Sequence, residues 1–128
     1  MTSSVDRLLA EARAELGHRP GPADLDRLVA EGALVVDTRP ESDRREEGEL
    51  PGAVVVERNV LEWRLAPDGE HRLPEAGDPD RVVVLVCNEG YASTLAAVAL
   101  RRLGLPRATD LDGGYRAWKT ARSEARPF

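Results

Sequence analysis

Apolar residues recur along this chain in two patterns, one typical of amphipathic helices and the other of short buried strands. The apolar residues of the first segment share one helical face, and they are Val5, Leu8, Leu9, Ala12 and Leu16. Ser3 or Ser4 can cap this helix, and Gly17 can end it. The pattern therefore predicts a helix from Val5 to Leu16.

Four runs of branched apolar residues predict strands, and the segments between them predict helices. The strands are expected at residues 34–36, 53–56, 82–86 and 108–111. The helices are expected from Pro22 to Gly32, over 59–65, from Ser93 to Gly104, and from the Gly113–Gly114 pair onward. The charged stretch 41–49 is expected to be a solvated short helix or turn, and the stretch 66–80, rich in Pro and Gly, a loop.

Several side chains on these elements are expected to pack inside the domain. Leu25, Leu28 and Val29 are expected to form the buried side of the second helix. The aromatic residues interpreted as packing residues are Trp63, Tyr115 and Trp118. The first helix can pack on its own domain or against a second subunit, so both a monomer and a homodimer remain open.

The order of these elements indicates the fold class. Short apolar strands without alternation, separated by helices, are typical of an α/β fold whose parallel sheet is buried on both faces. In such sheets, reactive groups gather beyond the carboxyl ends of the strands. Cys87, Asp37 and the turn at 57–59 all fall at predicted strand ends.

Composition narrows the classes of function. The chain has 128 residues, of which 41% are apolar and 32% charged, as expected for one globular domain. The net charge of -5 makes nucleic acid an unsuitable partner, and the absence of a long apolar stretch predicts neither a signal peptide nor a membrane span. One cysteine suits a reducing, cytoplasmic location. His18 and His71 stand apart from it, so we expect no metal site and no cofactor.

The single cysteine, Cys87, stands where a predicted strand passes through a short polar loop into a predicted helix. Backbone N–H groups and the positive end of the helix dipole point at such a loop, so a thiol there is expected to ionise more readily than an unperturbed one. The thiolate is the nucleophilic form. The alternative is that Cys87 is a buried small hydrophobic residue.

Four landmarks in sequence order resemble the rhodanese-like domain family. They are residues 35–39, residues 48–53, the strand and loop at Cys87, and residues 111–114 together with Trp118. The resemblance implies a central parallel sheet of about five strands with helices on both faces. It also divides the chain into an N-terminal helix, residues 1–17, and a rhodanese-like domain, residues 18–128.

The resemblance implies a sulfurtransferase with Cys87 as its nucleophile. In this family the cysteine takes a sulfane sulfur from a small donor, becomes a persulfide, and passes the sulfur to cyanide or a thiol, in some cases a thiol of a protein partner. The loop from Cys87 to Ala92 has the six residues of the sulfurtransferase branch, whereas the related phosphatases use a loop one residue longer.

The loop also departs from the family sequence Cys-Arg-x-Gly-x-Arg-Ser. Asn88 and Ala92 replace the two arginines, and Glu89 adds a negative charge that would oppose thiolate formation if it lay near the sulfur. An anionic donor would then rely on backbone N–H groups and on the hydroxyls of Ser93 and Thr94. We expect these changes to weaken binding of a dianion by about 2–4 kcal/mol, so activity on thiosulfate should be poor.

The predicted site consists of Cys87 and the residues after it. Its substrate-binding residues are Asn88, Glu89, Gly90, Tyr91, Ala92 and Ser93, where Gly90 permits a positive φ and Ser93 can also act as a helix N-cap. Asp37 and Arg39 are assigned structural support. Two alternatives remain: a non-catalytic interaction or regulatory module, and, less favoured, a phosphatase or arsenate reductase, which normally needs the missing arginine.

Overall fold

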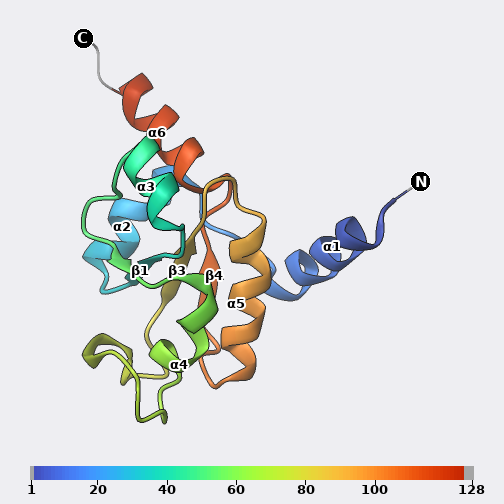
Figure 1. The fold of residues 1–128 in the computed structure, drawn as a ribbon. Helices are drawn as coiled ribbons and strands as arrows, with labels where there is room; N and C mark the ends of the chain where they lie inside the picture. The colour runs from blue at the N-terminus through green and yellow to red at the C-terminus, as the bar shows by residue number, and fades with distance from the viewer. Residues whose placement is uncertain (1, 126–128) are drawn as a thin grey trace.

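The central element is a parallel sheet of four strands in the order β2-β1-β3-β4, seen in a computed structural model that describes residues 2–125 (Figure 1). The strands are β1 (Leu34–Asp37), β2 (Val54–Val55), β3 (Val83–Val86) and β4 (Ala108–Asp110). The helices are α1 (Ser4–Leu16), α2 (Leu25–Ala30), α3 (Glu41–Glu47), α4 (Leu61–Leu65), α5 (Ala92–Arg102) and α6 (Gly114–Ala125). Short 3₁₀ turns at Pro22–Asp24, Arg58–Val60 and Pro74–Ala76 connect them.

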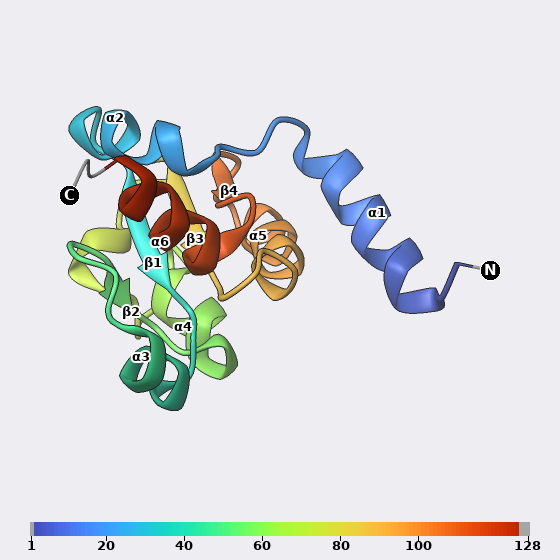
Figure 2. The ribbon, with the colours of Figure 1, turned by 90° about the horizontal axis from the view of Figure 1, so that it is seen from above.

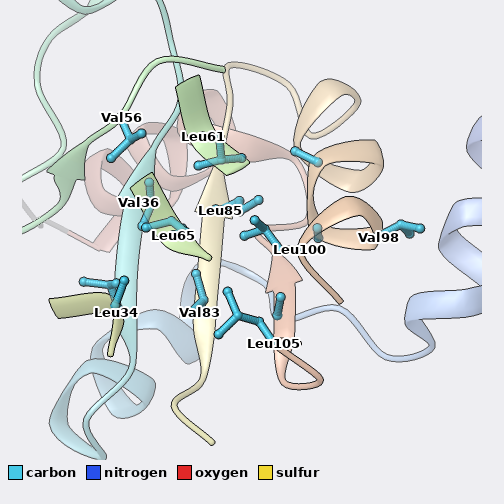
Figure 3. Close-up of a cluster of buried hydrophobic side chains, with 14 of the residues drawn as sticks. Leu34, Val36, Val56, Leu61, Leu65, Val83, Leu85, Val98, Leu100 and Leu105 are labelled. Carbon is cyan, nitrogen blue, oxygen red and sulfur yellow. The ribbon is translucent and has the colours of Figure 1, made fainter. Parts of the chain in front are cut away.

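Helices cover both faces of the sheet, which explains why its strands contain continuous apolar residues. One face packs against α4 and α5 through a core that includes Val36, Leu85 and Leu100 (Figure 3). The other face packs against α2 and α6 through Val84 and Tyr115. The predicted α/β fold with a parallel sheet between helices is therefore confirmed, with four strands where about five were expected.

The predicted second strand is shorter in the structure than in the sequence pattern. Only Val54 and Val55 form β2, which lies at the edge of the sheet and pairs with β1 alone among the described strands. The N–H of Val56 still donates to the carbonyl of Asp37 at 3.0 Å. The 3₁₀ turn after β2 begins at Arg58, which lies near Thr38 and Arg39 at the carboxyl end of β1.

Two predicted packing residues are instead exposed. Trp63 is 61% exposed because α4 buries Leu61 and Leu65, four residues apart, and a residue midway between them faces the opposite side. Val29 is 51% exposed, since α6 packs against the 3₁₀ turn before α2 and leaves the end of α2 open to solvent. Tyr115 is buried as predicted, and Trp118 is half-buried.

The first helix packs on its own domain through only part of its length. Ala12 and Leu16 join the core beside α5, whereas Val5 and Leu8 are exposed. Figure 2 shows α1 extending away from the sheet beyond α5. Ser3 caps the helix by accepting a hydrogen bond from the N–H of Asp6, as one of the two predicted caps. The C-terminal half of α1 is therefore fixed against the domain, close to the end of β3 and β4.

Candidate active site

Cys87 directly follows β3 and opens a tight loop that leads into α5. The thiol is partly exposed, and its sulfur accepts hydrogen bonds from the backbone N–H groups of Gly90 and Ser93, with N···Sγ distances of 3.1 and 3.4 Å. The loop thus surrounds one side of the sulfur with amide hydrogens, which stabilise negative charge there.

Gly90 is essential to the shape of this loop. Its φ of +84° lies in a region that side chains disfavour, and a Cβ would lie only 2.8 Å from the backbone nitrogen of Gly113. The loop therefore passes so close to the segment before α6 that only glycine fits.

Ser93 lies inside the first turn of α5 and is not its N-cap. The helix begins at Ala92 with Tyr91 as the cap residue. The hydroxyl of Ser93 donates to the carboxylate of Asp110 at 2.7 Å, and its oxygen lies 3.1 Å from the sulfur of Cys87. The predicted N-cap role of Ser93 is therefore wrong, because its hydroxyl binds the buried carboxylate of Asp110 instead. Asp110 lies on β4, 17 residues further along the chain, and local sequence patterns do not reveal such a contact.

Thr94 is also unavailable to a bound anion. Its hydroxyl lies 2.9 Å from an oxygen of Asp110 and 3.1 Å from the carbonyl of Gly90, and the side chain is buried. The expectation that this hydroxyl would hold an anionic donor is therefore wrong. Anion binding at the sulfur is left to the backbone N–H groups of the loop.

Two arginines from the N-terminal segment contact the loop, and sequence reasoning missed both. Arg13 of α1 donates to the carbonyl of Gly90 at 2.9 Å and lies over the ring of Tyr91, 5.6 Å from its centroid. Arg19 donates to the same carbonyl at 3.1 Å and forms an ion pair of 2.7 Å with Asp110. The hydrogen bond that Arg19 donates to Asp110 raises the pKa of Arg19, while burial opposes the shift.

Asp37 and Arg39 form a buried ion pair at the end of β1. Their closest atoms, Nη2 and Oδ2, are 2.8 Å apart, and the guanidinium also donates to the carbonyl of Gly48 at 2.8 Å. It lies over the ring of Tyr115, with its central carbon 3.8 Å from the centroid. These contacts connect β1 to α6 and to Gly48, which follows α3. The geometry is therefore compatible with the supporting role expected for Asp37 and Arg39.

The side chains of Asn88 and Glu89 are tied to neighbouring helices. Asn88 donates to the carboxylate of Glu47 on α3 at 2.6 Å, and Glu89 pairs with Arg116 on α6. Arg116 also binds Glu47 at 2.8 Å, and this hydrogen bond, together with the one from Asn88, lowers the pKa of Glu47. The loop is therefore clamped between α3 and α6.

An open cavity of about 360 Å³ lies in front of the thiol. The predicted site residues that line it are Cys87, Asn88, Glu89, Tyr91, Ala92 and Arg39, joined by Thr38, Pro40, Asp43 and Arg58. Gly90 and Ser93 contact the sulfur through their backbone N–H groups, and Ser93 also contacts it through its hydroxyl. Of the two cavity arginines, Arg39 is buried, whereas Arg58 is exposed and pairs with Glu62 at 2.7 Å.

This geometry is suited to nucleophilic chemistry at sulfur, and comparison with known proteins places it in a family. A family model described as the rhodanese-like domain matches residues 21–121. The chain belongs to the rhodanese-like domain family. The match covers the sheet and α2 to the greater part of α6, while α1 and Arg19 lie before it.

Relatives and solved structures agree with this rhodanese-like assignment. An adenylyltransferase and sulfurtransferase of Candida albicans is 31% identical over 102 residues, which are 78% of this chain and 23% of that protein. The chain therefore spans about a quarter of this curated relative. The human single-domain sulfurtransferase is 25% identical with a TM-score of 0.66, over 81% of this chain and 97% of that one.

A third similar protein shares more of the chain. It is a protein of unknown function, a possible tyrosine phosphatase, from Rhodopseudomonas palustris, with 27% identity and a TM-score of 0.82. The likeness covers 95% of this chain and 93% of that one, so it includes most of α1.

Among the described helices, none is long and apolar enough to cross a membrane.

Proposed function

We propose that this rhodanese-like domain is a sulfurtransferase or persulfide carrier that moves sulfane sulfur through a persulfide on Cys87. The observation that carries the proposal is the environment of the Cys87 sulfur. A cavity lies on one side of it, and on the other side it accepts hydrogen bonds from the N–H groups of Gly90 and Ser93. The sulfurtransferases among its relatives support this activity.

The chemistry proceeds in two steps. In the first, the Cys87 thiolate attacks the outer sulfur of a donor; a sulfur–sulfur bond to Cys87 forms, the donor's own bond to that sulfur breaks, and the electron pair leaves with the remainder of the donor. In the second, an acceptor thiolate or cyanide attacks the outer sulfur of the persulfide, and Cys87 leaves as a thiolate. The amide hydrogens of the loop favour the anionic sulfur at each stage.

The charges around the cavity favour a weakly charged donor over thiosulfate. Asp43 and Glu89 line the cavity, and its two arginines, Arg39 and Arg58, are paired with Asp37 and Glu62. No arginine lies within the loop from Cys87 to Ala92. A deprotonated persulfide group carries one negative charge where thiosulfate carries two, so it meets less repulsion at the sulfur of Cys87. Because the chain has one cysteine, the acceptor is a separate molecule in the reducing cytoplasm, which can be a small thiol, cyanide or the thiol of a partner protein.

The decisive experiment is sulfur loading followed by intact mass spectrometry. The protein is incubated separately with glutathione persulfide, polysulfide and thiosulfate, and we expect the mass of one sulfur atom to be added, most from the persulfide. Cys87→Ala should gain nothing, and a thiol should remove the sulfur from the wild type. If none of the three donors loads Cys87, the proposed activity is wrong, and turnover of an aryl phosphate would then point to a phosphatase.

One observation favours a second candidate, a non-catalytic interaction module. The loop from Cys87 to Ala92 contains no arginine or lysine that could bind an anionic donor, and the side chains of Asn88 and Glu89 already bind Glu47 and Arg116. Under this alternative, Cys87→Ser would leave partner binding unchanged while sulfur loading is absent from the wild type.

A further inference from the structure

Asp110 is a fully buried carboxylate at the end of β4, close to the sulfur of Cys87. A buried charge is costly unless it is paired and hydrogen-bonded. Arg19 supplies the pairing with two bonds, from Nε to Oδ1 at 2.7 Å and from Nη2 to Oδ2 at 3.0 Å. The side chain of Arg19 is itself only 10% exposed. Arg19 also pairs with the exposed Asp112, from Nη1 to Oδ1 at 3.2 Å. The two buried residues, Arg19 and Asp110, together carry no net charge.

This unit reaches the sulfur through the hydroxyl of Ser93. The single proton of that hydroxyl is donated to Asp110, so the oxygen presents a lone pair to Sγ at 3.1 Å. In this arrangement the Ser93 oxygen can accept a hydrogen bond from the thiol, but the hydroxyl cannot donate one to the thiolate. Without a compensating cation, the charge of Asp110 would act on the sulfur from a short distance and oppose ionisation of Cys87.

Arg19 also fixes the loop that holds the sulfur. Its Nη2 lies 3.1 Å from the carbonyl of Gly90, the residue whose N–H donates to Sγ. Arg13 donates to the same carbonyl from α1. The position of Gly90 is thus set by side chains from outside the loop, in a chain whose loop has lost its own arginines.

We propose that Arg19 is a positioning residue for Cys87, which neutralises Asp110 and holds Gly90 so that the thiol can react as a thiolate. Its relevance to catalysis rests on the proposed sulfurtransferase function, but its effect on the thiol does not. The other charged side chains at the loop and the cavity form four pairs, Glu89 with Arg116, Arg39 with Asp37, Arg58 with Glu62, and Asp112 with Arg19 itself. Arg13 binds the carbonyl of Gly90, and Asp43 lines the cavity.

The test compares alkylation of Cys87 by iodoacetamide at pH 7 in three variants, measured by intact mass. Arg19→Gln leaves Asp110 uncompensated, and we expect alkylation to slow by about 3- to 10-fold. Asp110→Asn keeps the shape and leaves Arg19 without its buried partner, with only the exposed Asp112 beside it, so alkylation should accelerate by a similar factor. The double variant removes both charges and should react within about threefold of the wild type.

Opposite signs in the two single variants distinguish this role from a merely structural one, which would move both rates in the same direction. Arg19→Lys, which keeps the charge, should react faster than Arg19→Gln. Thermal unfolding is recorded for each variant; if Arg19→Gln does not fold, Asp110→Asn and the double variant decide the question. Equal-sign or unchanged rates in the folded variants overturn the proposal.

Sulfur loading of the same proteins separates this inference from the function on which it rests. If alkylation follows the expected signs but no donor loads the wild type, the sulfurtransferase function fails and the positioning role of Arg19 stands. If the wild type loads sulfur but both single variants alkylate more slowly, the reverse holds.

Discussion

Glu89 of the loop forms an ion pair with Arg116 in the first turn of α6. Both side chains are about half exposed, at 49% and 53%. The negative charge that the sequence places beside Cys87 is therefore partly compensated by a residue 27 positions later. This pairing changes what should be expected from replacing Glu89.

Replacing Glu89 by Gln should accelerate alkylation of Cys87 at neutral pH, but by no more than about threefold, because an exposed, paired charge acts weakly. Arg116→Gln should slow it by leaving Glu89 unpaired. Iodoacetamide kinetics at low and high salt measure both effects, which should shrink as salt rises. An unchanged rate in Glu89→Gln would mean that this carboxylate does not act on the sulfur.

Introducing an arginine at position 92 should improve turnover of thiosulfate. Ala92 is exposed and lines the cavity in front of Cys87, so a guanidinium there can bind the donor's charged end. One charge-assisted hydrogen bond corresponds to an increase of about tenfold or more in kcat/KM. Ala92→Gln controls for side-chain length. A folded Ala92→Arg variant without any gain would contradict the inferred position of the donor.

Gly90→Ala should abolish sulfur loading and destabilise the domain by about 2–4 kcal/mol, since it combines a positive φ with a close approach to Gly113. Gly52→Ala is the matched control. Gly52 has a φ of +80°, and no atom lies within 4 Å of the position that a Cβ would occupy there, so this variant should lose only about 1 kcal/mol and keep its activity. Urea unfolding gives both values, and equal losses would show that the close approach does not matter.

The bonds of Glu47 to Arg116 and Asn88 should make the stability of the domain depend on pH in acid. They lower the pKa of Glu47 in the folded state, below an unfolded value of about 4.3. The resulting stabilisation is present above the unfolded value and is lost as pH falls through the folded one. The difference in free energy of unfolding between the wild type and Glu47→Gln should therefore shrink between pH 6 and pH 3.

Urea unfolding at several pH values in this range checks the prediction. Glu46→Gln, an exposed neighbour on α3, is the control and should leave the pH dependence close to that of the wild type. A constant difference between wild type and Glu47→Gln would show that the carboxylate contributes no pH-dependent stability.

The strand and turn that carry Cys87 could be predicted because a strand buried on both faces must be a continuous run of apolar residues, as Val83–Val86 is. The position of the thiol at the end of β3 followed directly. The aromatic character of Trp63 predicts burial, but the spacing of Leu61 and Leu65 places it on the exposed side of a helix of five residues. In so short a helix, two leucines already define the buried side.

The partners of the loop could not be predicted from local pattern. Arg19 meets Gly90 and Asp110 across 71 and 91 residues, and Arg13 meets Gly90 across 77. Arginines on an exposed helix and in a break between helices are ordinary features of a sequence. Only the docking of α1 beside α5 brings them to the loop, and that contact depends on the whole fold.

Arg13 and Arg19, whose guanidinium groups bind the loop at Gly90, lie before residue 21, where the family match starts. A protein trimmed to the matched segment would retain its four strands and its nucleophile, yet the carbonyl of Gly90 would lose both arginine donors. The family match thus marks what its members share, and if Arg19 has the role proposed above, the functional unit of this chain includes the segment before residue 21.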